Sequence, residues 1–308
     1  MDRENFINEM KQRKFGIELE FTGRRRSFIE RKLKEEGLLD DDLRDSKLRK
    51  WKLIYDGSIT AVRWRNGQYE STYEDNFKAE LVTPILEYDD IPFLQDIISF
   101  LRRNRCISSS GYMCGLHIHI DDTGFNEDSL RNLIRLMASK EKLLVNALQI
   151  PDDRLNRYCS YVDDEIKRRA RRKYRTIRQL EESWSYYSSR YRMLNLDSLF
   201  VGKGIEYRMF NGTMNDLEVK AYIQFALALT QSALSLDRCS MNKPTNITND
   251  KYAMRLWLNR MNLIGDEFKD CRRYMTKALS GDGAFADRNR RKFGVITDFS
   301  TEELPYLF

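Results

Sequence analysis

Apolar and polar residues alternate with a period of two in several short segments of the chain. The clearest is Phe15–Phe21, FGIELEF, where every second residue is large and apolar and the residues between include Glu18 and Glu20. The segments KAELVTP (78–84), GLHIHID (115–121) and IEYRMF (205–210) repeat the alternation. Because successive side chains of a strand point to opposite faces, we expect four half-buried strands here.

Turn residues predict two hairpins. Asp56-Gly57 would join two strands within 51–72, and the sequence Gly202-Lys203-Gly204 would turn a hairpin within 198–210. We expect Pro84 to end the strand that begins near residue 78.

Longer segments repeat apolar residues every three to four positions, which predicts helices. Asp90 and Asn126 are the expected N-caps of helices over 89–105 and 126–148. The remaining predicted helices are 27–39, 215–236, 250–264 and 266–279, and the first should end near Gly37. Strands that arrive in hairpins or between helices predict an α+β fold with a mostly antiparallel sheet and helices on one face.

No linker divides the 308 residues, and we expect a single catalytic domain. Its core would span about 13–236, with a charged and aromatic helical insertion at about 152–192 and a C-terminal helical extension at about 247–308.

The polar faces of the predicted strands carry ionisable residues of few kinds. Glu18 and Glu20 share one strand, Glu80 lies on another, and Glu206 and Arg208 lie on a third. The only two histidines of the chain, His117 and His119, lie two residues apart, with Asp121 beyond them. Such residues converge on ligands, whereas a merely hydrated sheet face more often carries Lys, Thr, Ser and Gln. Each of these residue pairs is common on protein surfaces. The hypothesis of a shared site therefore rests on their joint occurrence on matching faces of several strands.

If these strands share one sheet, several carboxylates lie close together and repel one another, so the cluster needs cations. Carboxylate oxygens suit Mg²⁺, with Mn²⁺ as an alternative. Zinc bound by His117, His119 and one carboxylate is another option. Four glutamates against two histidines favour the harder ion, and Mg²⁺ with few protein ligands implies a nucleoside triphosphate partner.

The net charge is +6, with hydrophobic residues at 41% and charged residues at 32%, as in a folded water-soluble chain. Five scattered cysteines without a Cys-x-x-Cys pair indicate a reducing compartment. The N-terminal MDRENFINEM has no apolar signal core, and the most apolar region is interrupted by glutamines. We therefore expect a cytoplasmic protein with no membrane partner.

The basic run Lys167–Arg178, KRRARRKYRTIR, could contact nucleic acid or an acidic partner. The simpler interpretation is a solvated helix face whose charges are matched by nearby acids, Asp163, Asp164, Glu165, Glu181 and Glu182. No nucleic-acid-binding motif accompanies the run, so we favour the simpler interpretation and do not expect nucleic acid as a partner.

Five motifs together resemble the putative amidoligase family of carboxylate–amine ligases. In chain order they are FGIELEF, YDGSI, AELVTPIL, GLHIHID and IEYRMFNGTMN, and the resemblance covers roughly Phe15 to Leu236. It implies the glutamine synthetase-like catalytic fold, a curved antiparallel sheet with helices packed on its outer face. The inner face would bind ATP and Mg²⁺.

The resemblance also implies roles for individual residues. The implied metal ligands are Glu18, Glu20, Glu80, His117 and Glu206. Arg208 and His117 would contact the nucleotide phosphates, and Asn211 is a candidate polar contact. His119 faces the same site, and Asp56 matches an acidic position near the amine or substrate pocket. Arg208, Asp56 and His119 are therefore the expected catalytic residues.

The implied reaction joins a carboxylate to an amine through an acyl phosphate, on substrates that are expected to be peptides or proteins. Three alternatives stay open at this point. They are a zinc hydrolase that uses His117, His119 and Glu206, a guanidino-kinase-like phosphotransferase, and a non-catalytic binding protein that docks through its basic insertion. A homo-oligomer is compatible with the sequence.

Overall fold

The computed structural model describes residues 2–38, 51–162, 164–170, 176–184, 189–239 and 249–284. Its centre is a six-stranded sheet in the order β2-β5-β1-β6-β8-β7, and every neighbouring pair is antiparallel. The strands are β1 (Phe15–Phe21), β2 (Lys52–Ile54), β5 (Ala79–Val82), β6 (Gly115–Ile120), β7 (Leu194–Asn195) and β8 (Ile205–Asn211). The predicted mixed fold with an antiparallel sheet and helices is confirmed.

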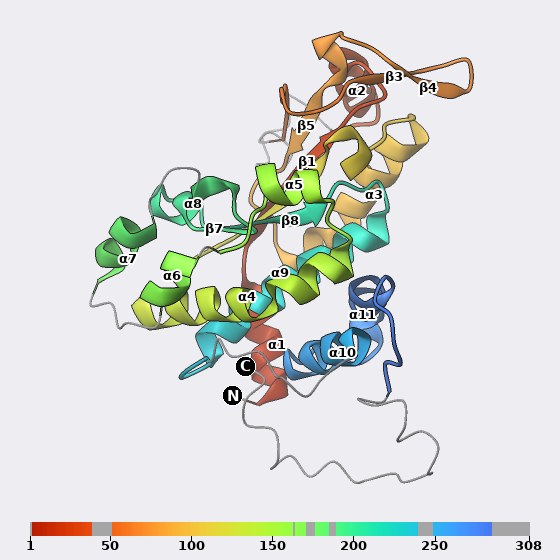
Figure 1. Ribbon diagram of the computed structural model, residues 1–308. Coiled ribbons are helices and arrows are strands. Elements are labelled where there is room, and N and C mark those ends of the chain that lie inside the picture. Colours follow the sequence, from red (N-terminus) through yellow and green to blue (C-terminus); the bar gives the residue numbers. More distant parts are fainter. Residues whose placement is uncertain are drawn as a thin grey trace.

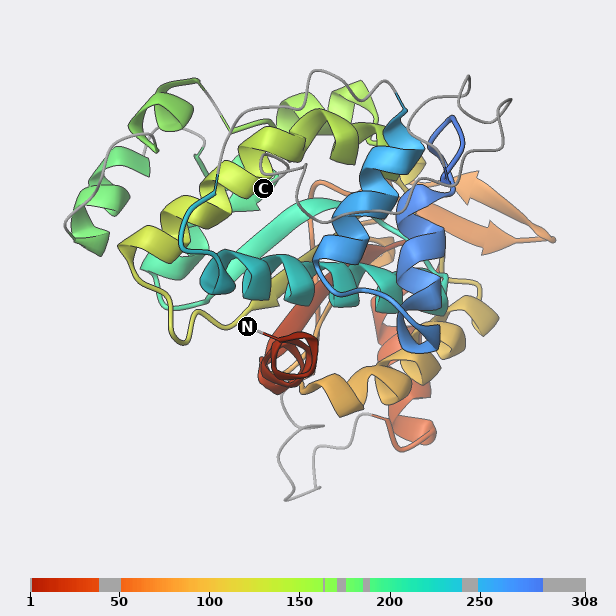
Figure 2. The same cartoon turned by 90° about the horizontal axis from the view of Figure 1, so that it is seen from below.

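The long helix α9 (Asp216–Ser235) lies across one face of the sheet (Figures 1 and 2). Around it pack α1 (Arg3–Gln12), α3 (Ile91–Arg103), α4 (Glu127–Leu148) and α11 (Lys269–Thr276), and α10 (Asp250–Arg260) lies against α11. Asn126 and Asn215 are the N-caps of α4 and α9 and accept backbone N–H groups of the first turn. Each helix therefore begins where the sequence predicts.

Period-two alternation explains how the sheet meets α9. The apolar set of β1, β6 and β8 is fully buried, namely Ile17, Leu19, Phe21, Leu116, Ile118, Ile120, Tyr207 and Phe210. Phe210 stacks on Tyr222 of α9 with ring centroids 4.6 Å apart, and the hydroxyl of Tyr207 lies 2.8 Å from Thr230 Oγ1. The opposite face of the same strands is therefore left for polar residues.

A β-bulge interrupts the pairing of β6 with β8. Ile118 lies opposite Tyr207 and Leu116 opposite Phe210, so two residues of β8 face the single residue His117. The first of the two is Arg208.

The segment 152–192 contains α5 (Asp152–Arg157), α6 (Asp164–Arg169), α7 (Ile177–Trp184) and the 3₁₀ turn Ser189–Tyr191. The shorter elements elsewhere are α2 (Arg26–Glu35), α8 (Asp197–Phe200), β3 (Val62–Arg65), β4 (Gln68–Ser71) and the 3₁₀ turns Asp75–Phe77, Tyr88–Asp90, Ser110–Tyr112 and Asp266–Phe268. No helix in the described ranges is both long and apolar enough to cross a bilayer.

Three local predictions are wrong. Asp56-Gly57 does not turn a hairpin, because β2 pairs with β5 and the hairpin partners are β3 and β4. Their turn is Asn66-Gly67, whose positive φ angles of 52° and 84° suit an Asn-Gly pair. Asp56 instead folds its own loop by accepting the Ser58 N–H.

The other two wrong predictions concern residues 198–201 and Asp90. Residues 198–200 belong to α8 and Val201 follows it, and the strands that pair with β8 are β6 and β7. Asp90 accepts the Glu87 N–H and so caps the short 3₁₀ turn before α3, while α3 starts without a side-chain cap.

The turn before β8 offers a matched test of backbone strain. Gly202 and Gly204 have φ angles of +75° and +76°, but a Cβ at Gly204 would lie 2.4 Å from the Ile120 carbonyl oxygen, whereas nothing lies within 4 Å of one at Gly202. We expect Gly202→Ala to lower the free energy of unfolding by about 1 kcal/mol and Gly204→Ala by about 3 kcal/mol. Urea unfolding of both variants measures the difference, and equal losses would contradict this packing.

Candidate active site

The register of the sheet gathers polar residues of four strands on the face opposite α9. Directly opposed residues point to the same side of a sheet. Three polar pairs are directly opposed, Glu20 with Glu80, Glu18 with His117, and His119 with Glu206. The strand alternation thus brings together the glutamates and histidines that the sequence singled out.

His117 lies at the centre of this cluster and is almost fully buried. Its Nδ1 lies 3.2 Å from Glu18 Oε2 and 3.8 Å from Glu206 Oε1, and its Nε2 lies 3.8 Å from Glu20 Oε1. One imidazole therefore contacts three carboxylates, which come from the two strands that flank β6, namely β1 and β8.

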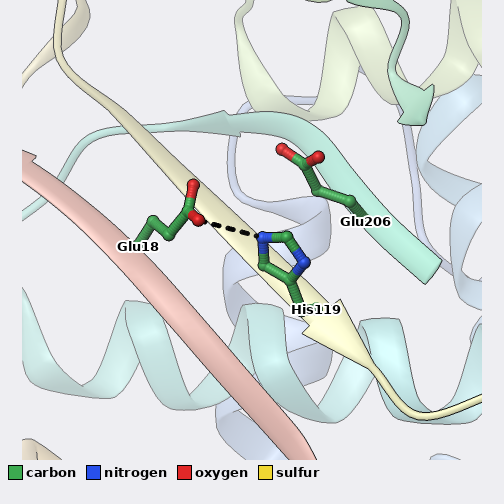
Figure 3. Close-up of side chains that lie close together, drawn as sticks. All are labelled: Glu18, His119 and Glu206. Carbon is green, nitrogen blue, oxygen red and sulfur yellow. Dashed lines mark ion pairs between the residues drawn. The ribbon is translucent and has the colours of Figure 1, made fainter. Parts of the chain in front are cut away.

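Two groups of side chains present atoms that could hold a cation. In the first, Glu18, His119 and Glu206 extend from β1, β6 and β8 toward one another (Figure 3). In the second, Glu20 and Glu80 are joined by Asp56, which follows β2. Within each group the candidate ligand atoms all lie within 4.8 Å of one another.

Asp56 is placed by its own loop. Its Oδ1 accepts the Ser58 N–H at 2.7 Å and the Ser58 hydroxyl at 2.5 Å, which fixes the carboxylate beside the two glutamates. The sequence suggested an acidic residue near the substrate pocket, and it gave no sign that this residue joins Glu20 and Glu80.

The two ring nitrogens of His119 face different groups. Its Nδ1 lies 3.3 Å from the Ser198 hydroxyl of α8. Its Nε2 is buried, lies 3.4 Å from Glu18 Oε1, and makes no hydrogen bond with any described residue. If Nδ1–H donates to Ser198, Nε2 carries a lone pair toward the group, as in a metal-binding histidine.

Arg208 and Glu206 form a buried ion pair. Arg208 Nη1 donates to Glu206 Oε1 at 2.5 Å, and Asn195 of β7 donates to the other oxygen of Glu206 at 2.6 Å. Arg208 Nε also donates to the Tyr158 carbonyl at 3.3 Å. Both oxygens of Glu206 are thus fixed, and the guanidinium is held at the edge of the cluster.

The crowding shifts pKa values in opposite directions. Burial, and then the negative charges of Glu18, Glu20 and Asp56, raise the pKa of Glu80 to about 8. Burial also favours neutral Glu18, but its contacts with His117 and His119 outweigh this effect and hold its pKa well below the usual range. The pKa of His119 is raised, because Glu18 and Glu206 outweigh the effect of its burial.

Two cavities adjoin the cluster. A groove of about 410 Å³ runs beside Glu18 and His119, between the segment Val82–Ile85 and the loop Gly202–Gly204. A smaller cavity of about 190 Å³ adjoins Glu20 and His117, and its lining includes Arg208 and the insertion residues Arg154, Tyr158, Arg190 and Tyr191.

Residues 11–230 match the family model described as putative amidoligase enzyme. The chain belongs to the putative amidoligase family. Membership indicates an enzyme, a ligase that forms amide bonds and so acts on carboxylate and amine substrates. No curated protein matches the chain.

The putative amidoligase motifs thus contribute most of the cluster. Asn211, however, does not contact the clustered glutamates and histidines in the described hydrogen bonds. It lies opposite Gly115 at the end of β8, and its amide donates to the carbonyls of Leu148 and Gln149 at the C-terminal end of α4. Its contact with a nucleotide stays a prediction, as do the other assigned roles.

Sequence reasoning missed several residues around the site, namely Asn195, Ser198, Arg154, Tyr158, Arg190 and Tyr191. The last two belong to the segment SWSYYSSRYR, whose aromatic residues could line a substrate groove, although packing under the helices is the interpretation that its sequence favours. In fact Trp184 is fully buried, whereas Tyr191 lines the smaller cavity.

Two basic residues of the run, Lys167 and Arg178, pair with acids. Lys167 Nζ lies 2.9 Å from Glu141 and 3.9 Å from Asp164, and Arg178 lies 3.1 Å from Glu182. Residues 171–175 of the run, and Asp163, lie outside the described residues.

Glu80 makes stability depend on pH. An unfolded glutamate titrates near about pH 4.3, so between that value and about 8 the folded state holds a proton that the unfolded state lacks. The stability linked to this proton is complete below about pH 4.3 and is lost as pH rises through about 8. The lowered pKa of Glu18 acts only at acid pH, below its unfolded value, so the two windows do not overlap.

We therefore expect Glu80→Gln to be more stable than the parent protein by about 1–3 kcal/mol at about pH 8.5 in EDTA, and by about half as much at about pH 6. Thermal unfolding at both pH values measures this, with Glu36→Gln at the exposed end of α2 as the control. An equal loss of Tm with pH in parent and Glu80→Gln would contradict the assigned protonation.

Proposed function

We propose that this amidoligase is an ATP- and Mg²⁺-dependent carboxylate–amine ligase that forms a peptide or isopeptide bond through an acyl phosphate. One observation carries the proposal. Two groups of cation-ligating side chains lie side by side on one sheet face, with Arg208 at their edge and a cavity on either side.

The residues present fit divalent cations. Glu20, Asp56 and Glu80 crowd three carboxyl groups into a buried space, which raises the pKa of Glu80 to about 8 and leaves negative charge to be compensated. The first group adds Glu18 and Glu206 and the buried Nε2 of His119. Mainly carboxylate ligands favour Mg²⁺ or Mn²⁺, and bound Mg²⁺ would neutralise phosphate charge during transfer.

The larger groove suits the nucleotide. It has room and an apolar wall for a base, with Pro84 and the exposed Ile85, and it reaches Glu18 and His119. Lys14 and Lys203 also line it and could meet phosphate oxygens. The substrate carboxylate would then approach from the smaller cavity.

The reaction has two steps. A carboxylate oxygen attacks the γ-phosphorus, the bond to the β-phosphate oxygen breaks, and ADP leaves. The amine nitrogen then attacks the acyl carbon, the bond to the phosphate breaks, and the amine gives up a proton. In the proposal Arg208 donates to the phosphoryl oxygens of both steps, because a guanidinium presents two parallel N–H groups.

Asp56 would accept the amine proton. It is the least buried member of its group and also lines the smaller cavity, so an incoming amine can reach it. Because Glu80 is largely protonated near neutral pH without a cation, Asp56 is better suited to that role than Glu80.

The zinc hydrolase is supported less well. It needs both histidines with Glu206, whereas His119 is grouped with the two carboxylates of Glu18 and Glu206. A phosphotransferase on the same site would be recognised by a phosphorylated product in place of an amide.

Glu18→Gln should weaken binding of the Mg²⁺ complex of ADP by roughly tenfold or more, because it removes a charge from the first cation group. Glu20→Gln should weaken it through the second group. Isothermal titration calorimetry measures both, with Glu70→Gln on β4 as a control outside the cluster. Unchanged affinity in both site variants would remove these glutamates from the cation site.

Arg208→Lys should lower turnover by at least about tenfold, equivalent to about 1.4 kcal/mol of transition-state stabilisation. Lysine keeps the charge but loses the planar fork that can meet two phosphoryl oxygens. The assay is ADP release with the carboxylate and amine substrates and detection of the amide by mass spectrometry. Thermal unfolding and Mg²⁺ binding serve as controls, and unchanged turnover would contradict the assigned role.

A further inference from the structure

The smaller cavity has a wall of three arginines. Arg154 comes from α5, Arg190 from the 3₁₀ turn Ser189–Tyr191, and Arg208 from β8. Tyr191 joins them, because its ring centroid lies 5.0 Å from the Arg190 guanidinium and 5.8 Å from that of Arg208. Two of the three arginines, Arg154 and Arg190, belong to the insertion. The sequence did not predict that either of them lines this cavity.

Arg154 is built into the wall. It is 3% exposed, and its Nη2 donates to the carbonyls of Arg208, a bulge residue, and of Phe210, the first residue after the bulge, at 2.9 Å each. A Cβ on Gly115 would lie 2.4 Å from its guanidinium, so only glycine leaves room for it. Its Nε is buried and has no hydrogen-bond partner among the described residues.

The charges of this wall are unequally compensated. Arg208 is paired with Glu206, but Arg154 bonds only to neutral carbonyls and Arg190 stacks on Tyr191. In the part of the chain that the structure describes, no carboxylate lies within 4.0 Å of the guanidinium of Arg154 or Arg190. A buried guanidinium without a counter-charge is costly, and an anion in the cavity would remove that cost.

We propose that the cavity binds a second carboxylate of the substrate, so that the ligase selects molecules with two carboxylates, one to react and one to be anchored by Arg154 and Arg190. This proposal rests on the proposed function, which places the reacting carboxylate beside Arg208. A carboxylate suits the cavity better than a phosphate, because Glu20 and Asp56 also line it and repel a doubly charged group more strongly.

The test uses the full chain saturated with Mg²⁺ and ADP. Succinate, glutarate and adipate are titrated by calorimetry, each against its own monoamide, which keeps the length and loses one charge. We expect at least one dicarboxylate to bind about tenfold or more tightly than its monoamide. Arg190→Gln should abolish this preference and leave affinity for the Mg²⁺ complex of ADP unchanged.

Arg178→Gln is the matched control, because Arg178 is an exposed arginine of the same insertion and pairs with Glu182 away from the cavity. Arg154→Lys tests the buried position, with Tm to detect misfolding. Since Arg190 is exposed, its variant keeps the test valid even where Arg154→Lys does not fold.

The outcomes separate this proposal from the function on which it rests. Binding of the nucleotide without any preference for a dicarboxylate would overturn the proposal and leave the ligase function standing. A preference retained in Arg190→Gln, or loss of nucleotide affinity in that variant, would also overturn it. Competition by inorganic phosphate without a dicarboxylate preference would assign the cavity to phosphate. A dicarboxylate preference without any nucleotide binding would instead count against the ATP-dependent function.

Discussion

Mutual repulsion between carboxylates is the constraint on which the polar face of the sheet depends. Glu18, Glu20, Glu80 and Glu206 project from three strands of one sheet, and Asp56 joins them from a loop. Unscreened charges this close would oppose the very strand pairing that brings them together. The fold can tolerate them only with compensation at short range.

The protein supplies part of that compensation and distributes it unevenly. His117 contacts three glutamates, Arg208 and Asn195 hold Glu206, and the Gly115 N–H donates to Glu20 at 2.6 Å. Glu80 contacts none of these groups, and its pKa is raised to about 8, which favours the protonated carboxyl at neutral pH. The apolar face, packed on α9, provides the stability that holds this strained arrangement in place.

The sequence predicted the faces of β1, β5 and β6, and of β8 up to its bulge, because one property, period-two alternation, decides both the core and the cluster. It failed where tertiary contacts compete with local signals. Asp56-Gly57 and Asn66-Gly67 are both good turn sequences, and only the pairing of β2 with β5 decides which of them makes the hairpin. Residues 198–201 were predicted as the first strand of a hairpin, but residues 198–200 lie in α8, where the Ser198 hydroxyl is 3.3 Å from His119 Nδ1. Arg154 and Arg190 were beyond prediction, because the insertion that carries them has no pattern that fixes its path over the sheet.

The bulge between β6 and β8 has a consequence for how the chain can change during evolution. Before it, even-numbered residues of β8 share the face of His119, and after it the odd-numbered Asn211 lies opposite Gly115. The extra residue reverses which side chains, even- or odd-numbered, point to the polar face in the rest of the strand. Loss of that one residue would restore simple alternation and turn one half of β8 over, carrying either the Glu206–Arg208 pair or Asn211 to the core side. A change in the length of β8 between Glu206 and Asn211 would therefore disturb more of the site than a single substitution in the strand.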